Sequence, residues 1–337
     1  MTGSYLYLKK LFYIVITSVL ISISYSQLSL AVCSETGMTP GGGNIIDCPP
    51  PVQNTNISTG TAVATTNFAD RLNILSGGGV VINGGGVAVN TSNGDDIINV
   101  NGQIIHNNNN TALVVGNGSD SVFVNTGGII SSSTIAIGMV GGDNFVQLNG
   151  GTISGGIRGS NEADTVEMVD GLMTDDAVTL RDGDDIVRIL GGTIEEGTLF
   201  MGDGNDTVIL SDGTFLGEVG IDLDEGNDTL TISNDFNILD IECDEGFDTV
   251  TFAMEVEEGL FRIARELAQA DPSQGSITIN GFTYEWFSCE RIVDDLKGDR
   301  SPPVIPTLSQ WGLISMAAIL GIVGFMVIRR RQLTTNS

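Results

Sequence analysis

Positively charged side chains are scarce in this chain of 337 residues. Fourteen Lys and Arg residues stand against 42 Asp and Glu residues, which gives a formal net charge of −28. A chain with so few cations has little to neutralise a phosphate backbone, so we do not expect nucleic acid as a partner. Strong acidity instead favours solubility, cation binding or an exposed location.

Residue types that usually carry catalysis are also few. Histidine occurs once, as His106, inside a run of asparagines that we expect to form a solvated loop, and aromatic residues make up only 6% of the chain. An enzyme that cleaves polysaccharides needs carboxylates with a basic or proton-transferring partner, and usually aromatic side chains that stack on sugars. Arg158, Arg181 and Arg188 lie near aspartates in the sequence, where surface salt bridges are expected. We therefore predict no catalytic residue.

Only four cysteines are present, and none are in the CxxC spacing typical of zinc sites, which argues against zinc. Cys33 and Cys48 are close in sequence, and Cys243 and Cys289 both lie near the end of the repeats described below. The pairs Cys33–Cys48 and Cys243–Cys289 are the simplest of the three pairings that four cysteines allow. The sequence leaves the other two open.

One short sequence motif is repeated along most of the chain. In Gly202–Leu210, which reads GDGNDTVIL, Asp206 is followed by apolar residues at +2 and +4, Val208 and Leu210. The same register recurs at nearly regular intervals, with its reference residue at Asp70, Asp96, Asp120, Asn144, Asp164, Asp185, Asp206, Asp228 and Asp248. A repeat period of roughly 20 residues indicates a solenoid.

Each repeat predicts three short strands separated by corners. Apolar residues at +2 and +4 with a polar residue between them are typical of a half-buried strand. Glycine corners follow, as in Gly191–Ile194, and the 45 glycines suit corners that need positive φ or close backbone approach. We predict an all-β fold, a single-stranded parallel β-helix of about nine coils over residues 68–252. At about 4.8 Å per coil, these coils would form a rod roughly 40 Å long.

The later corners are rich in aspartate, and the role of these aspartates has two interpretations. Their aspartates can bond to nearby backbone N–H groups and cap the turns. Alternatively, stacked carboxylates that repel one another would be relieved by calcium, which prefers six to eight oxygen ligands. The candidate calcium ligands are Asp184, Asp185, Asp203, Asp206, Asp224, Asp228, Asp244 and Asp248. The repeated motif, as in Gly202–Leu210, resembles the calcium-binding nonapeptide of RTX proteins, although it occurs only once per repeat and not in tandem.

The N-terminus has the features of an export signal. Lys9 and Lys10 precede the apolar stretch 11–23, and small residues allow cleavage after Ala31 or after Ser26. We therefore assign residues 1–31 to a signal peptide. Residues 32–67, rich in Gly, Pro, Asn and Thr, are predicted to form an N-terminal cap, because the open end of a solenoid must be covered.

The repeat pattern ends after Phe252, and residues 253–297 are predicted to form a C-terminal cap. Residues 257–270 have helical spacing, residues 276–279 and 282–287 have strand patterning, and residues 292–296 suggest a last helical turn. We expect Tyr284 and Trp286 to pack inside this cap.

The last residues predict a membrane helix. A Pro-rich spacer at 298–306 precedes residues 307–331, in which no charged side chain occurs from Trp311 to Ile328. That uncharged stretch is just long enough to span a bilayer, and Arg329, Arg330 and Arg331 would remain in the cytoplasm. The repeats would then lie on the other side of the membrane.

The same stretch resembles the IPTL-CTERM sorting signal of exported proteins in Gram-negative bacteria. The resemblance rests on Ile305, Pro306, Thr307, Leu308, Trp311, Gly312 and the three arginines that follow the apolar segment. It implies recognition by an exosortase-type membrane protease, removal of the tail, and often a link to extracellular polysaccharide or the cell surface. The repeats themselves are similar to those of bacterial surface and autotransporter-like β-helices.

Together these features predict an exported, surface-displayed or extracellular β-helix with a non-catalytic structural or adhesive role. Its expected partners are an exosortase-type protease, the inner membrane through the C-terminal helix before processing, and an exopolysaccharide or other surface polymer. Two alternatives stay open: a polysaccharide lyase or hydrolase on the same fold, and a repeat module stabilised by Ca²⁺.

Overall fold

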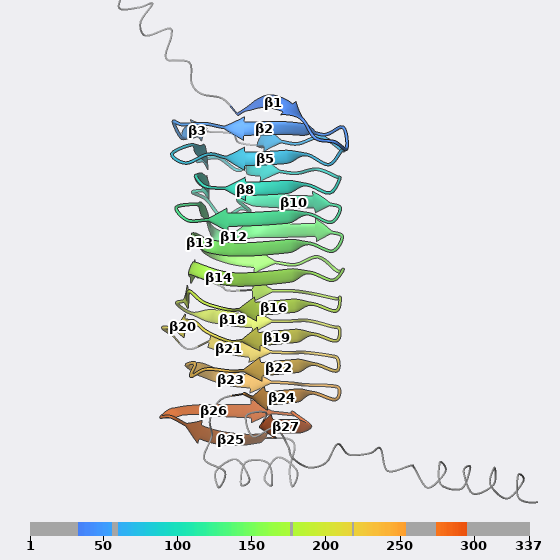
Figure 1. The fold of residues 1–337 in the computed structure, drawn as a ribbon, viewed down its shortest axis with the longest axis vertical. Coiled ribbons are helices and arrows are strands. Elements are labelled where there is room, and N and C mark those ends of the chain that lie inside the picture. The colour runs from blue at the N-terminus through green and yellow to red at the C-terminus, as the bar shows by residue number, and fades with distance from the viewer. Residues whose placement is uncertain (1–32, 56–59, 176–177, 218, 254–273, 295–337) are drawn as a thin grey trace, which may run out of the picture. The chain divides into compact units, whose positions relative to one another are not determined.

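The computed structural model describes residues 33–55, 60–175, 178–217, 219–253 and 274–294. Every regular element in these residues is a β-strand, and the 27 strands belong to one continuous sheet wound into a solenoid (Figure 1). The chain divides into two compact units, residues 1–293 and 294–337, and the solenoid belongs to the first. The predicted all-β parallel β-helix of about nine coils is confirmed.

The coils form three faces, each a parallel ladder of strands from successive coils. Face 1 contains β2 (Asn44–Cys48), β5 (Arg71–Ile74), β8 (Ile97–Val100), β11 (Ser121–Asn125), β16 (Ile186–Ile189), β19 (Thr207–Leu210), β22 (Thr229–Ile232), β24 (Thr249–Phe252) and β27 (Arg291–Asp294). Face 2 contains β3 (Gln53–Thr55), β6 (Gly79–Ile82), β9 (Gln103–His106), β17 (Thr193–Ile194) and β20 (Thr214–Phe215). Face 3 contains β4 (Thr61–Ala64), β7 (Val87–Asn90), β10 (Leu113–Asn117), β15 (Val178–Thr179), β18 (Gly197–Phe200), β21 (Val219–Asp222), β23 (Ile238–Glu242) and β26 (Phe282–Phe287).

Three long strands bend around corners and join more than one face. These are β12 (Ile129–Gly141), β13 (Phe145–Arg158) and β14 (Thr165–Thr174). Two further strands pair antiparallel at the ends of the solenoid: β1 (Ser34–Met38) with β2, and β25 (Gln274–Ile279) with β26.

The strand register stacks equivalent residues of the repeat directly on one another. Val208 of β19 pairs with Leu230 of β22, and Leu210 pairs with Ile232, and all four side chains are fully buried. The residue between them, Ile209, is only half-buried and lies on the outer side beside Thr231. The +2 and +4 residues therefore form the core, where each large apolar side chain contributes about 1.5–3 kcal/mol by leaving water.

The first coil begins earlier than the predicted start at residue 68. Strands β2, β3 and β4 pair in parallel with β5, β6 and β7, so residues 44–64 contribute a complete set of three faces within the predicted N-terminal cap. Ile46 and Cys48 lie at +2 and +4 from Asn44 and are buried. The prediction missed this coil because residues 32–67 are rich in Gly, Pro, Asn and Thr, which favoured an irregular cap.

At the other end, β25 and β26 confirm the predicted strands, and Tyr284 and Trp286 are fully buried as expected. The predicted helical turn at 292–296 is wrong over its described part, because Ile292 belongs to β27, which pairs with β24. Backbone bonding to the open edge of the last coil decides this segment, since Arg291 N–H donates to Asp248 O at 3.0 Å.

Several predictions fall outside the described residues: the signal peptide 1–31, the cap helix 257–270, the spacer 298–306 and the tail helix 307–331. No helix within the described part of the chain is long and apolar enough to span a membrane.

A glycine two residues before most of the reference residues allows successive coils to approach closely. A Cβ added to Gly226 would lie 1.6 Å from the carbonyl oxygen of Gly204 in the preceding coil, and one added to Gly204 would lie 1.7 Å from Gly183 O. The φ of Gly226 lies outside the left-handed range of +20° to +160°, so the steric contact is what requires glycine there.

We predict that Gly226→Ala lowers the free energy of unfolding by about 3 kcal/mol, because two backbones must separate to admit the methyl group. Chemical denaturation measures the change. Gly41→Ala is the matched control, since its Cβ would find an ordinary contact, Ala69 Cβ at 3.4 Å, and we expect little effect. Equal stability of the two variants would contradict the close approach.

Candidate functional site

A single hydrogen-bonded column of side chains runs along one corner of the solenoid. We call it the inner ladder, and it consists of the reference residues Asp70, Asp96, Asp120, Asn144, Asp164, Asp185, Asp206, Asp228 and Asp248. The backbone N–H of each member donates to the side-chain Oδ1 of the next, over distances of 2.6 to 3.2 Å. All members are buried, with exposed fractions of 0 to 3%.

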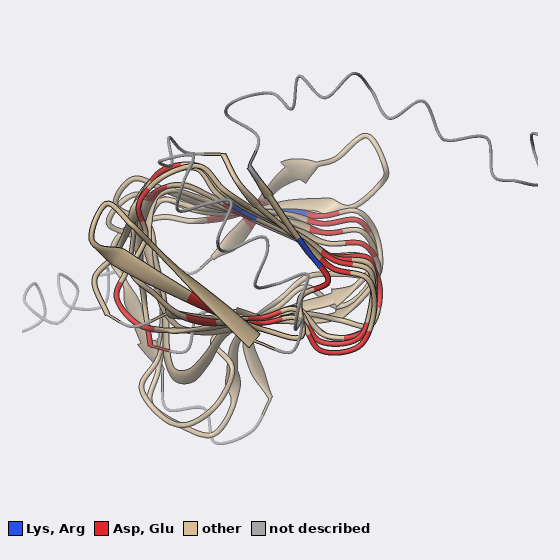
Figure 2. Ribbon diagram, turned by 90° about the horizontal axis from the view of Figure 1, so that it is seen from below, with Lys and Arg blue, Asp and Glu red and all other residues tan. Residues whose placement is uncertain are grey.

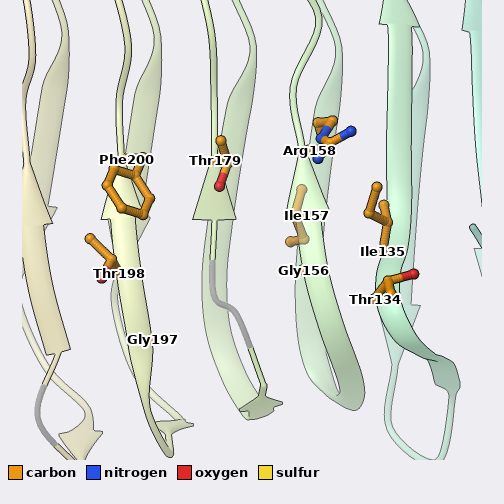
Figure 3. Close-up of a pocket in the computed structure, with 9 residues that line it drawn as sticks. All are labelled: Thr134, Ile135, Gly156, Ile157, Arg158, Thr179, Gly197, Thr198 and Phe200. Atoms are coloured by element: carbon orange, nitrogen blue, oxygen red, sulfur yellow. The ribbon is translucent and has the colours of Figure 1, made fainter. Parts of the chain in front are cut away.

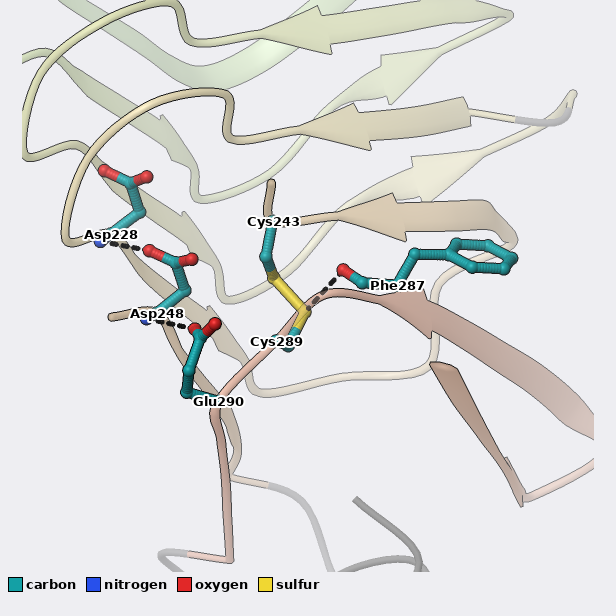
Figure 4. Close-up of a disulfide and its surroundings, with 6 residues drawn as sticks. All are labelled: Asp228, Cys243, Asp248, Phe287, Cys289 and Glu290. Carbon is teal, nitrogen blue, oxygen red and sulfur yellow. Dashed lines mark hydrogen bonds between the residues drawn. A yellow bond between two sulfur atoms is a disulfide. The ribbon is translucent and has the colours of Figure 1, made fainter. Parts of the chain in front are cut away.

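Both ends of the inner ladder are closed by residues of the terminal coils. At the start, Asn44 N–H donates to Asp70 Oδ1. At the end, Asp248 N–H donates to Glu290 Oε2 at 2.8 Å, beside the disulfide that joins Cys243 to Cys289 (Figure 4). The ladder therefore connects every coil to the next from the first to the last.

The second carboxylate oxygen separates the ladder aspartates into two kinds. Asp70 Oδ2 accepts from Thr66 N–H and Oγ1–H, and Asp164 Oδ2 accepts from Ser160 N–H at 2.7 Å and Oγ–H at 3.0 Å. In contrast, the Oδ2 atoms of Asp120, Asp185, Asp206, Asp228 and Asp248 are buried without a hydrogen-bond partner in the described structure. Leaving such an oxygen unpaired is costly, and more so when it carries charge.

This burial changes the acidity of the ladder. Loss of solvation raises the pKa of Asp185, Asp206, Asp228 and Asp248 to about 7 and that of Asp120 to about 6, and the backbone N–H bond each accepts opposes only part of the rise. Nearby carboxylates add to it, as Asp185 does for Asp206.

Four of the candidate calcium ligands are ladder members, and the other four lie outside it. Asp203, Asp184 and Asp244 are exposed and Asp224 is half-buried. They occupy three different positions of the corner, because Asp184 directly precedes its ladder residue, Asp203 lies three residues before, and Asp224 and Asp244 lie four residues before. Figure 2, a view down the axis of the solenoid, shows acidic residues stacked at the corners and very few basic ones.

The ladder bonds occupy one of the two carboxylate oxygens of each inner aspartate, an oxygen that a calcium ion could otherwise use. Each inner aspartate already gives Oδ1 to a backbone N–H, which matches the turn-capping interpretation. Asp184 Oδ1 likewise accepts from Asn205 N–H and Nδ2–H, and these bonds lower the pKa of Asp184. No group of three or more His, Cys, Asp or Glu side chains placed to hold a metal ion occurs among the described residues. Calcium binding remains a prediction.

Disulfides tie down both ends of the solenoid. Cys33 is bonded to Cys48 of β2, with their Cα atoms 4.0 Å apart, and Cys243 is bonded to Cys289, with Cα atoms 5.2 Å apart. These are the two pairs that the sequence gives as the simplest pairing. Each bond fixes a terminal segment against the first or last coil, where neighbouring coils support the chain on one side only.

A shallow groove on face 3 was not found from the sequence. Its volume is about 190 Å³, and it is lined by Thr134, Ile135, Gly156, Ile157, Arg158, Thr179, Gly197, Thr198 and Phe200 (Figure 3). Arg158, Thr179 and Phe200 are register partners on three successive coils, and Phe200 is 43% exposed. Sequence reasoning considered Arg158 only in relation to nearby aspartates, because the partners of one row belong to different coils and are distant in sequence.

His106 lies inside the structure, so the prediction of a solvated loop residue is wrong. The ring is 2% exposed, with Nε2 2.6 Å from Gly86 O and Nδ1 2.8 Å from Asn108 O. The asparagines that follow it hold the neighbouring coil, since Asn107 Nδ2–H donates to Asn83 Oδ1 at 2.7 Å. His106 therefore serves to hold a corner together, a role that needs neither exposure nor catalysis.

Asp164 is the best-satisfied member of the ladder, since Asn144 and Ser160 each give it a backbone and a side-chain hydrogen bond. We predict that Asp164→Ala lowers the free energy of unfolding by about 3 kcal/mol, because it leaves buried N–H groups unpaired. Asp143→Ala removes an exposed carboxylate one residue from the ladder and should change stability by less than about 0.5 kcal/mol. Denaturant titration of both variants distinguishes them, and equal losses would contradict the ladder's role.

For calcium, we expect melting temperatures in millimolar calcium, in millimolar magnesium and in chelator to agree closely, because the inner aspartates already bond to backbone N–H groups. Magnesium controls for general screening of the net charge of −28. A rise with calcium alone, reversed by chelator and lost in Asp224→Ala, would instead establish a calcium-stabilised repeat module.

Comparison with known proteins finds one family feature. The model of the IPTL-CTERM motif matches residues 305–332, the stretch that carries the resemblance seen in the sequence. No curated protein and no solved structure matches the chain. The chain thus carries an IPTL-CTERM sorting motif after its β-solenoid, which indicates an exported protein processed by an exosortase-type protein.

Proposed function

We propose that this protein is a surface-displayed or extracellular rod with a structural or adhesive role and no catalytic activity. The observation that carries the proposal is the IPTL-CTERM motif at residues 305–332, which follows a solenoid of about nine coils. In this proposal residues 1–31 direct export, and the segment 307–331 anchors the chain in the inner membrane until the tail is cut. The solenoid then holds its faces outside the cell.

The composition of the corners supports this role. Stacked side-chain amides bond coil to coil on the surface, as Asn117 Nδ2–H does to Asn93 Oδ1 at 2.8 Å and Asn93 Nδ2–H does to Asn67 Oδ1 at 2.9 Å. With a net charge of −28, the outer surface resists association with other acidic chains. Such a scaffold stays extended without needing a ligand.

For the partner, we propose that a surface polysaccharide lies on face 3, over the groove of Arg158 and Phe200. The exposed ring of Phe200 offers an apolar surface to a sugar, and the hydroxyls of Thr179 and Thr198 and the guanidinium of Arg158 offer hydrogen bonds. The groove is shallow and its lining contains no Asp or Glu side chain of the kind that cleaves glycosidic bonds, which supports binding over cleavage.

The sorting role is tested in a host that carries an exosortase-type protease. We predict that the full chain appears at the cell surface or in the medium with a mass reduced by the tail. Replacing Ile305, Pro306 and Thr307 with alanine should retain the uncut chain in the membrane fraction, because the protease no longer recognises the motif. Cell fractionation and intact mass spectrometry measure both outcomes.

The matched control replaces Thr334, Thr335 and Asn336, which lie beyond the matched motif, and should be cut normally. Equal processing of the motif variant and the control would refute the sorting role. Processing without display at the surface or in the medium would refute the rod's proposed location.

A further inference from the structure

One member of the inner ladder, Asn144, carries an amide in place of a carboxylate. Its hydrogen bonds show which chemical group a ladder position favours. Asn144 Oδ1 accepts from Asp120 N–H at 3.2 Å, as the aspartate Oδ1 atoms do elsewhere. Its Nδ2 donates to Gly142 O at 2.7 Å and to Asp164 Oδ1 at 2.9 Å. The second atom of the side chain thus points at two oxygens and needs a hydrogen to give them.

Asp120 occupies the same position one coil earlier. Its Oδ1 accepts from Asp96 N–H at 2.6 Å, so its Oδ2 corresponds to the Nδ2 of Asn144. Asp120 is 1% exposed, and its Oδ2 is buried with no hydrogen-bond partner in the described structure. Gly118 precedes it as Gly142 precedes Asn144, and both glycines have positive φ, so the equivalent acceptors are Gly118 O and Asn144 Oδ1. A carboxylate has no hydrogen to donate to them.

The charges around Asp120 do not favour its ionised form. Besides burial, Asp95, on the corner of the neighbouring coil, raises the pKa of Asp120 by charge repulsion. Asp96, the ladder residue of that coil, is a second acid, and its backbone N–H, which donates to Asp120 Oδ1, lowers that pKa only in part. Asn144 faces it from the other side and is neutral, and Asp143 beside Asn144 is another acid. Burial raises the pKa of Asp120 to about 6, in agreement with the geometry.

We propose that Asp120 is a proton-binding residue of the folded solenoid. At mildly acidic pH its Oδ2 takes a proton from water, and the new O–H group donates to the oxygens that the amide of Asn144 would reach. The coils around Asp120 are then held more firmly in mildly acidic than in alkaline surroundings. The proposal concerns a ladder residue that lies several coils before the first candidate calcium ligand, Asp184.

The pH dependence has a defined sign. The folded-state pKa of Asp120, about 6, lies above the model value of 3.8, so the folded chain binds the proton more tightly than the unfolded chain. The buried charge of ionised Asp120 therefore destabilises the fold fully above about pH 7, and this destabilisation disappears as the pH falls to about 4. A difference of about two units between the folded-state and unfolded-state pKa of Asp120 corresponds to a change of about 100-fold in the unfolding equilibrium constant.

Asp120→Asn tests this directly in the full chain, purified in a mild detergent. At pH 8 the amide supplies the missing donor and removes the buried charge, so the unfolding equilibrium constant should fall by up to about 100-fold. At pH 4 the variant and the wild type should agree, because both then carry a donor. A variant less stable than wild type at pH 8, or a difference that does not change with pH, would overturn the proposal.

Two further variants separate proton binding from general ladder effects. Asp164→Asn should destabilise at both pH values, because its second oxygen accepts from Ser160 and an amide there would oppose two donors. Asn144→Asp, the reciprocal change, should behave as wild type at pH 4 and lose stability at pH 8. If Asn144→Asp is as stable as wild type at pH 8, the ladder position does not discriminate a donor from a carboxylate and the proposal fails, even if Asp120→Asn cannot be purified.

Discussion

The backbone-to-side-chain hydrogen bond of the inner ladder is the interaction on which the solenoid most depends. Parallel strands join each coil to the next along the faces, but the coils are free to shift at their corners unless something fixes them. The ladder does so with one bond per coil, from Asn44 through Asp206 to Glu290. Because each donor is a backbone N–H and each acceptor belongs to the following coil, the bond sets both spacing and register.

The same arrangement explains why aspartate or asparagine recurs once per coil at this corner. Only a short side chain with an oxygen acceptor fits the buried corner and reaches the N–H of the preceding coil, so aspartate and asparagine recur at the ladder positions. The glycine two residues before, as at Gly226, permits the backbones to approach closely enough for the bond to form. Acidity in this chain is therefore partly internal, and its net charge overstates the charge available to a partner at mildly acidic pH.

A scaffold of this kind suits a surface rod. The core is a repeated stack of Val, Ile and Leu, the corners are bonded coil to coil, and disulfides fasten both ends. The groove on face 3 combines an exposed aromatic ring with a guanidinium group. The sorting motif lies after the solenoid in the sequence, so cutting it leaves the solenoid whole.

The sequence alone determined the repeat period, the inward +2 and +4 residues and the sorting motif, because these are local patterns that a strand or a protease reads directly. It did not reveal the coil at 44–64, the strand character of Ile292 or the burial of His106, since each depends on a neighbouring coil that is distant in sequence. It suggested that aspartates cap turns but not that their acceptors bond the preceding coil. Only the stacked structure decided that, because a hydrogen bond between coils exists only once register brings N–H and carboxylate together.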